Sequence, residues 1–289
     1  MRLSALLKGE ALSVSFEVFP PKTDMNFESV RVATEEIAAL CPAFMSVTYG
    51  AGGGISRYTL DIAKNIKEHY GVPTLAHLTC VSSTRETVRQ KINEMRAAGI
   101  ENVMALRGDL LPEMVGADRR EWHYRHAIDL VRELKTEGFC IGGACYPEVH
   151  PESLNQREDI RYLKEKVDAG CDFLTTQMFF DNNLFYNFLY KIREAGITVP
   201  VMPGIMPITN GNQVARAISL SGSLMPQRFK ALVDKFGDTP AAMKQAGIAY
   251  ATDQIIDLFA NGIKNVHVYS MNKPDVARAI LANLSDILG

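Results

Sequence analysis

The feature that most constrains this chain is an alternation of short apolar runs with longer, charged segments of helical period. Eight runs have the length and residue types of β-strands: VSFEVF (14–19), FMSVTYG (44–50), TLAHLTC (74–80), NVMALRG (102–108), CIGGACY (140–146), DFLTTQMF (172–179), VPVMPGI (199–205) and NVHVYS (265–270). Segments such as RETVRQKINEMRAAGI lie between most of them and several end in Ala-Gly, a frequent helix C-terminus. The pattern predicts an α/β fold, a single (β/α)8 TIM barrel over residues 1–289, with extra helices in residues 212–262 before the last strand. A doubly wound parallel sheet is the alternative, because sequence alone does not show strand order.

Polar residues interrupt these runs near their carboxyl ends. Alternation along SVSFEVF places Val14 and Val18 on the helix-facing side and Glu17 toward the barrel interior. A buried carboxylate is costly unless it is paired or used. The same parity directs Thr175, Gln177 and Phe179 inward from the sixth run. Barrels of this type build their sites at the carboxyl ends of the strands, where LRGD also places Arg107. The side chains that we expect to converge on one pocket are Glu17, Thr48, His77, Asp109, Tyr146 and Gln177.

Each of these residues also has a structural explanation, and the residues alone leave it open. The structural alternatives are an ion-paired carboxylate at Glu17, a core histidine at His77, a turn ion pair between Arg107 and Asp109, packing against prolines at Tyr146 and a solvated charge at Lys166. Gln177 is the hardest to explain by packing, because a buried amide needs several hydrogen-bond partners.

Charge and motif content narrow the function classes. A net charge of -2 gives no electrostatic argument for nucleic acid or an anionic membrane, so a small ligand is expected. Five cysteines without CxxC spacing suggest neither a disulfide framework nor a zinc site, and no 18-residue apolar run is present. We therefore expect a soluble, cytoplasmic protein with free thiols and no membrane association.

Few short motifs of known chemistry appear. The sequence lacks GxGxxG after a strand, GxxxxGK[ST], HExxH and GxSxG. The glycines of YGAGGG (49–54) give a weak phosphate-loop signal. His123 and His126 in EWHYRHA would share a helical face but have no third ligand nearby, so no metal site is expected.

Seven segments in order resemble the methylenetetrahydrofolate reductase family, from about residue 13 to the C-terminus: SFEVFPPKT, SVTYGAGG, HLTC, LRGD, YPEVHPE, KVDAGCDFLTTQMFFD and PGIMPI. The resemblance implies a flavin-containing barrel that reduces 5,10-methylenetetrahydrofolate to 5-methyltetrahydrofolate in one-carbon metabolism and methionine biosynthesis. It implies bound FAD, reduced first by NADH or NADPH in ping-pong kinetics.

The resemblance also assigns roles to individual residues. It makes Glu17 the general acid that protonates the departing N10 of the folate, and has Asp109 and Gln177 bind the pterin, with Asp109 also close to the flavin. The FAD-binding positions that it implies are Thr48, His77, Leu106, Arg107, Gly108, Asp109, Tyr146, His150, Asp159 and Lys166.

The chain departs from the family pattern at two places. Ala217 stands near the position where some relatives carry an aromatic residue against the folate or nicotinamide, and the role of the loop 110–126, with Trp122, is open. Since the chain stops after the barrel, no feedback by S-adenosylmethionine is expected, and relatives suggest a homo-oligomer of unknown symmetry. The functional alternatives are a flavin-free methyltransferase or aldolase barrel, and a non-catalytic subunit that binds folate or flavin.

Overall fold

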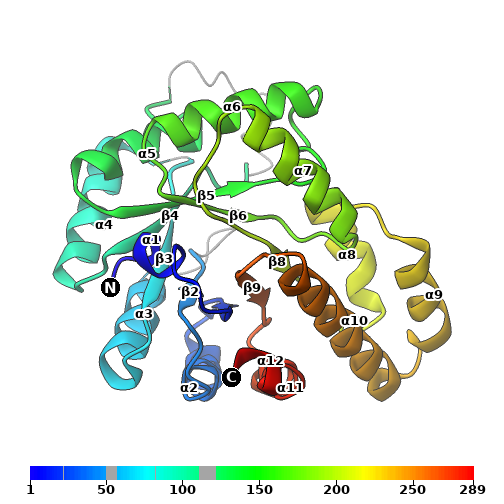
Figure 1. The fold of residues 1–289 in the computed structure, drawn as a ribbon. Helices are drawn as coiled ribbons and strands as arrows, with labels where there is room; N and C mark the ends of the chain where they lie inside the picture. The colour runs from blue at the N-terminus through cyan, green and yellow to red at the C-terminus, as the bar shows by residue number, and fades with distance from the viewer. Residues whose placement is uncertain (22, 50–56, 82, 111–121) are drawn as a thin grey trace.

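The computed structural model describes residues 1–21, 23–49, 57–81, 83–110 and 122–289, and these residues form one sheet of nine parallel strands. The strands are β1 (Ser13–Val18), β2 (Met45–Val47), β3 (Thr74–Thr79), β4 (Asn102–Leu106), β5 (Cys140–Cys145), β6 (Phe173–Thr176), β7 (Val201–Met202), β8 (Gly204–Ile205) and β9 (Asn265–Tyr269). Their spatial order is β7, β6, β5, β4, β3, β2, β1, β9, β8, so each strand pairs with its sequence neighbour except β7 with β8, and β1 pairs with β9. The sheet curls into a nearly closed barrel surrounded by helices (Figure 1). The predicted (β/α)8 barrel is therefore confirmed, and the doubly wound sheet is excluded.

The seventh predicted strand is divided into two short strands at Pro203. Before the break, Val201 and Met202 pair with β6, and after it Gly204 and Ile205 pair with β9. Proline has no backbone N–H to give to a ladder, although the carbonyl of Pro203 still accepts a hydrogen bond from the backbone N–H of His267 at 3.0 Å. The barrel thus closes through this one segment, which changes strand partner halfway along.

Twelve α-helices are formed by the described residues: α1 (Leu3–Leu6), α2 (Phe27–Ala38), α3 (Arg57–Tyr70), α4 (Arg85–Ala97), α5 (Ala127–Thr136), α6 (Gln156–Asp168), α7 (Asn182–Glu194), α8 (Asn212–Ser221), α9 (Gln227–Phe236), α10 (Pro240–Ala260), α11 (Pro274–Asn283) and α12 (Ser285–Leu288), with a 3-10 turn η1 (Asp24–Asn26). Polar N-caps start several of them, as Asn155 does for α6 and Asp181 for α7. The helices α8 and α9 precede α10 and the last strand, as predicted, and α9 lies on the outside of the molecule (Figure 1).

One helical expectation is wrong. His123 and His126 do not share a helical face, because α5 begins only at Ala127. The carboxylate of Asp129 accepts hydrogen bonds from the backbone N–H groups of Arg125 and His126 at 2.9 and 3.1 Å, and so fixes the start of the helix there.

The barrel interior is apolar at its amino-terminal end and polar toward the other. At the amino-terminal end, apolar side chains from four strands meet and are covered by Leu3 and Leu7 of the N-terminal segment. The strand residues are Leu75, Met104, Phe173 and Met202. The side chain of Asn102 accepts a hydrogen bond from the backbone N–H of Leu3 at 2.8 Å and holds this segment in place. Burying each large apolar side chain contributes about 1.5–3 kcal/mol. This end of the interior is therefore filled by apolar side chains, and Glu17, Ser46 and His77 lie nearer the carboxyl ends of their strands.

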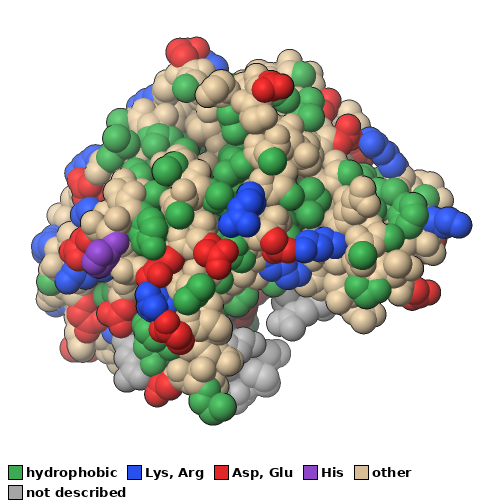
Figure 2. All heavy atoms as spheres, turned by 90° about the horizontal axis from the view of Figure 1, so that it is seen from below, with side chains coloured by type: hydrophobic (Ala, Val, Ile, Leu, Met, Phe, Trp, Pro, Cys, Tyr) green, Lys and Arg blue, Asp and Glu red, His purple; other side chains and the backbone are tan. Residues whose placement is uncertain are grey.

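The surface charges and the state of the cysteines match what the sequence predicts. Figure 2 shows acidic and basic side chains interspersed over the face seen from below. All five cysteines are free thiols, and only Cys41 is exposed. Within the described part of the chain, no helix combines the length and the apolarity needed to cross a membrane.

Candidate active site

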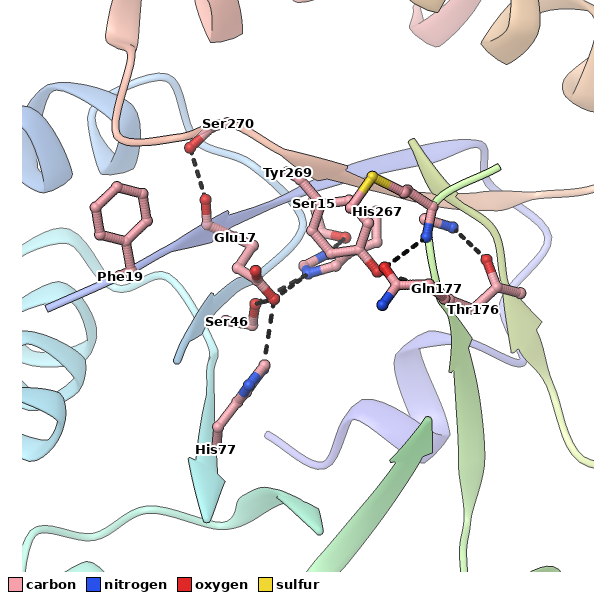
Figure 3. Close-up of polar contacts among 12 residues, drawn as sticks. Ser15, Glu17, Phe19, Ser46, His77, Thr176, Gln177, His267, Tyr269 and Ser270 are labelled. Atoms are coloured by element: carbon pink, nitrogen blue, oxygen red, sulfur yellow. Dashed lines mark hydrogen bonds and ion pairs between the residues drawn. The ribbon is translucent and has the colours of Figure 1, made fainter. Parts of the chain in front are cut away.

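Glu17 lies in the barrel interior, near the carboxyl end of β1, as the alternation predicts. Its strand neighbours Phe16 and Val18 are fully buried in the core between the sheet and the helices. The carboxylate atom Oε2 lies 3.4 Å from Oγ of Ser46 on β2 and 3.6 Å from Nε2 of His77 on β3 (Figure 3). Three neighbouring strands therefore direct polar side chains to one point.

The protonation states at this point follow from burial. Only 20% of the Glu17 side chain is exposed, and within the described residues no lysine or arginine nitrogen lies within ion-pair distance of its carboxylate. Burial raises the pKa of Glu17 to about 8. Burial also lowers the pKa of His77 to about 4. Near neutral pH, Glu17 therefore holds a proton and His77 is neutral, and the ion-paired alternative for Glu17 is not what the structure shows.

His267 on β9 is a third polar neighbour, and sequence analysis did not single it out. Its Nδ1 lies 2.7 Å from Oγ of Ser15, and its Nε2 lies 2.9 Å from Oγ of Ser46 and 4.0 Å from Oε2 of Glu17. The ring is 1% exposed and stacks on Phe44 at a centroid distance of 5.3 Å. Burial lowers its pKa to about 3, so it too is neutral. The alternation used for the first run, applied to NVHVYS, would have placed this histidine inward.

Tyr269 also points inward from β9. Its hydroxyl donates a hydrogen bond to the backbone carbonyl of Thr176 at 2.5 Å. Burial, with the charges of Glu17 and Tyr146 as smaller causes, raises the pKa of this phenol well above its usual value. Tyr269 thereby connects the Glu17 region with the end of β6.

The loop after β9 clamps the end of β1. The hydroxyl of Ser270 donates to the backbone carbonyl of Glu17 at 2.6 Å. The side-chain amide of Asn272 accepts from the backbone N–H of Phe19 and donates to its carbonyl, both at 2.9 Å. Met271 and Asn272 have φ angles of 54° and 52°, a left-handed conformation that asparagine tolerates better than most residues. This loop therefore holds the backbone at Glu17 and again at Phe19.

Arg107 and Glu152 form a second polar group at the barrel mouth. The guanidinium makes two bonds of 2.7 Å to the carboxylate of Glu152, and its Nε donates to the carbonyl of Gly108 at 3.1 Å. The turn pairing of Arg107 with Asp109 is thus not its main contact, and Asp109 is exposed. Gly108 has a φ of 91°, and a Cβ there would lie 2.9 Å from a methyl group of Val81, so glycine is required.

The segment after β5 contributes Tyr146 and His150, whose rings meet edge to face at 4.6 Å. Burial raises the pKa of Tyr146 to about 12 and lowers the pKa of His150. Asp159 on α6 accepts from the backbone N–H of His150 at 3.1 Å, and Lys166 on the same helix donates to the carbonyl of Ala144 at 2.5 Å. Lys166 is half-buried and engaged at the end of β5, so it is not the solvated charge of the structural alternative.

Three other expected residues lie at strand ends. Thr48 follows β2 and its backbone N–H donates to the carbonyl of Val18 at 3.0 Å. Leu106 ends β4 and packs against the inner apolar cluster. Gln177 follows β6, is half-buried, and its Oε1 accepts from the backbone N–H of Met178 at 2.9 Å, so the amide oxygen has a local partner.

One expectation does not match the placement. Phe179 does not face the barrel interior but stacks on Phe185 of α7 at 5.4 Å, because β6 ends at Thr176 and the alternation ends with it. Ala217 is 6% exposed and packs in the apolar cluster of α8, α9 and α10, so its side chain faces a core. The glycines at 50–54 and most of the loop 110–126, namely 111–121, lie outside the described residues.

Comparison with known sequences covers nearly all of the chain. A family model for methylenetetrahydrofolate reductase matches residues 2–285. The chain is 36% identical over 274 residues to the 5,10-methylenetetrahydrofolate reductase of Pectobacterium carotovorum, covering 94% of this chain and 90% of that protein. It is 36% identical over 282 residues to methylenetetrahydrofolate reductase (NADH) 1 of Zea mays, covering 93% of this chain and 48% of the maize protein. The chain thus spans about half the length of the plant relatives that it matches.

Comparison with solved structures supports the fold. A protein from Clostridium thermocellum, described as binding two copies of 5-methyl-5,6,7,8-tetrahydrofolic acid, superimposes with a TM-score of 0.68 at 14% identity, covering 100% of this chain and 99% of that one. At 14% identity, this structural similarity supports only the barrel fold. The sequence matches support the family, because they extend over more than nine-tenths of the chain. This chain belongs to the methylenetetrahydrofolate reductase family.

Proposed function

We propose that this protein reduces 5,10-methylenetetrahydrofolate to 5-methyltetrahydrofolate, using FAD and either NADH or NADPH. Family membership supports the reaction class. The observation that carries the proposal is the carboxyl of Glu17, which burial in the barrel interior keeps protonated at neutral pH near the carboxyl end of β1. A protonated carboxyl in this place is costly for the fold and suits an acid catalyst.

Glu17 would act as the general acid of the folate reaction. The five-membered ring of the substrate must open before its methylene carbon can be reduced, and N10 needs a proton as the C–N bond breaks. A carboxyl with a pKa of about 8 holds that proton at neutral pH, while an ordinary glutamate has lost it. Such a group typically contributes on the order of 10²- to 10⁴-fold in rate.

The residues at the barrel mouth fit a flavin dinucleotide. Arg107 and Lys166 supply positive charge and N–H donors suited to phosphate and ribose groups. The buried Nε2 of His77 finds no hydrogen-bond partner among the described residues, as expected of a side chain that meets a bound ligand. FAD would supply hydride chemistry here, accepting from the nicotinamide and giving to the folate, so that the two substrates use the site in turn with ping-pong kinetics.

The remaining members of the proposed FAD site share the same end of the barrel. They are Thr48, Leu106, Gly108, Asp109, Tyr146, His150 and Asp159. Asp109 and Gln177 would also bind the pterin, the first through an exposed carboxylate and the second through its amide. Since Ala217 is buried in a core, another side chain would have to stack on the nicotinamide or the folate.

The absorption spectrum of the purified protein tests this proposal. Flavin bands should be present under anaerobic conditions, bleach on addition of NADH or NADPH, and return on addition of methylenetetrahydrofolate. A protein that stays colourless after incubation with FAD contradicts the reductase and favours a folate-binding subunit. Bands that bleach only with another reductant would keep the folate reaction and remove the nicotinamide donor.

A further inference from the structure

We propose that the hydroxyl of Thr175 is a further FAD-binding group that meets the flavin ring system inside the barrel, an inference that rests on the proposed function. Buried polar atoms of side chains almost always have a hydrogen-bond partner in folded proteins. Oγ1 of Thr175 on β6 has none among the described residues, although this residue is only 5% exposed. The one other strand residue of the described chain with such an atom is His77, whose Nε2 is proposed to meet the same cofactor.

The side chain of Thr175 points into the barrel. Within a strand, successive residues face opposite sides of the sheet. Leu174 packs in an outer apolar cluster with side chains of α6 and α7, whereas Phe173 belongs to the apolar cluster inside the barrel. Because β6 continues to Thr176, the alternation still holds at Thr175, which therefore shares the interior face with Phe173.

Contacts within the barrel place Thr175 close to the layer that Glu17 occupies. Tyr269 on β9 is the register partner of Glu17, and its hydroxyl donates to the backbone carbonyl of Thr176 at 2.5 Å (Figure 3). In the other direction, Oε2 of Glu17 lies 3.6 Å from Nε2 of His77. Glu17 is thus connected toward β6 by Tyr269 and toward β3 by His77, the two strands that carry an unpartnered polar atom.

Solvent-accessible space reaches this layer beside Thr175. Its register partner on β5 is Ala144, which remains partly exposed although it lies within the strand. The next residue, Cys145, packs in the outer cluster with Leu174, so Ala144 faces the barrel interior. A ligand that lies against Ala144 would therefore lie beside Thr175 as well.

The polar groups of this layer suit an uncharged heterocycle better than a phosphate. Near neutral pH, Glu17 is protonated, His77 is neutral, and a threonine hydroxyl carries no charge. Arg107, the charged group proposed for the phosphate and ribose, is paired with Glu152 at the barrel mouth instead. The ring system of FAD has carbonyl oxygens, ring nitrogens and an N–H group. A hydroxyl can donate to the first two or accept from the third, so this ring system can supply the missing partner.

Depth favours the flavin over the folate as the partner of Thr175. Gln177, proposed to bind the pterin, follows the end of β6 and is half-buried, whereas Thr175 lies two residues earlier and is buried. In the proposed ping-pong reaction the folate enters and leaves in every turnover, while FAD stays bound. The deeper of the two polar groups is therefore assigned to the resident cofactor.

A substitution that keeps the shape of the side chain tests the hydroxyl by two measurements. Thr175→Val replaces the hydroxyl by a methyl group, and titration of the apoprotein with FAD, followed by flavin fluorescence, should show a Kd raised roughly three- to tenfold. The same apoprotein should be at least as stable to urea as the wild type, because an unpaired buried hydroxyl has been removed. An unchanged Kd for FAD overturns the inference, even if the affinity for methylenetetrahydrofolate falls, since the hydroxyl then serves the folate.

Three further variants separate ligand binding from structural damage. Thr34→Val removes a buried hydroxyl of α2 that donates to the carbonyl of Arg31, and should leave the Kd for FAD unchanged. Thr175→Ser and Thr175→Ala lose the same methyl group and differ only in the hydroxyl, so the serine variant should bind FAD more tightly. Equal affinities of these two contradict the inference, also where Thr175→Val fails to fold. If Thr175→Val lowers both apoprotein stability and FAD affinity, Thr175 is structural and the inference fails.

The wild-type protein alone decides the proposed function. If the wild-type apoprotein does not bind FAD, the proposed function fails and takes this inference with it. If the wild type binds FAD and Thr175→Val binds it equally well, only the inference on Thr175 fails.

Discussion

Oε2 of Glu17 lies 3.6 Å from Nε2 of His77, and neither side chain is charged near neutral pH. The distance is that of an ion pair, but burial favours the neutral form of an acid and of a base alike. Ionising both would require solvation that the barrel interior does not provide. Near neutral pH the carboxyl of Glu17 is therefore protonated and the ring of His77 is neutral.

Replacing Glu17 by glutamine should separate the two halves of the proposed reaction. Glu17→Gln keeps the size of the side chain but cannot release a proton, so reoxidation of the flavin by methylenetetrahydrofolate should slow by about 10²- to 10⁴-fold. Reduction by NADH or NADPH needs no acid and should change little. Rapid-mixing spectra measure both steps. Glu101→Gln, at the amino-terminal end of the barrel where its carboxylate pairs with the amino group of Met1, is the control.

The pH dependence of the folate step should follow the raised pKa of Glu17. The general acid works only while protonated, so the rate should be level below about pH 8 and fall above it. With an ordinary glutamate pKa the rate would already fall in acid solution. A rate for the folate step that declines across the acidic range would contradict the assignment. In Glu17→Gln the remaining rate should lose this dependence.

The same carboxyl should make the protein less stable as pH rises. The unfolded chain loses the Glu17 proton at the ordinary glutamate pKa, whereas the folded chain keeps it up to about pH 8, so stability falls between those two values. Glu17→Gln removes this loss and should gain stability relative to wild type by at most about 5 kcal/mol at pH 8. Urea unfolding at an acidic pH and at pH 8 measures the difference. Equal gains at both pH values would argue against the raised pKa.

Two substitutions at Asn272 should separate its hydrogen bonds from its backbone conformation. Asn272→Gly tolerates the φ of 52° but loses both bonds to Phe19, and should cost about 1–3 kcal/mol of unfolding free energy. Asn272→Ala should cost about 1 kcal/mol more, because alanine resists the left-handed conformation. Urea denaturation compares the two variants. If Ala and Gly are equally destabilising, the conformation contributes nothing.

Arg107 should matter for flavin retention through its planar geometry. The planar guanidinium of Arg107 makes two parallel bonds to Glu152 and is thereby held in a fixed orientation. Arg107→Lys keeps the charge but loses this geometry and the paired N–H donors proposed to bind FAD, so FAD affinity should fall roughly tenfold or more. Titration of the apoprotein with FAD, followed by flavin fluorescence, measures this. Arg89→Lys, an exposed arginine of α4 near Glu133, is the matched control and should bind FAD as the wild type does. An unchanged affinity in Arg107→Lys would remove Arg107 from the proposed FAD site.

Local patterns were sufficient to predict the barrel and the orientation of Glu17. Strand alternation depends only on the chain itself, so the inward direction of Glu17 and His77 could be predicted from residue parity. The same rule, applied to the last strand, would have found His267. It failed at Phe179, because parity holds only while the strand continues and β6 ends three residues earlier.

Tertiary structure decided which polar groups meet. Glu152 takes the guanidinium of Arg107, although the two residues are 45 positions apart and the sequence offered Asp109 nearby. Beside Glu17, the contact between Ser46 and His267 joins two strands whose residues are 221 positions apart in the chain. Sequence spacing carries no information on such distances. The raised pKa of Glu17 could not be predicted from the sequence, because the desolvation that raises it depends on the packed fold and not on any one segment.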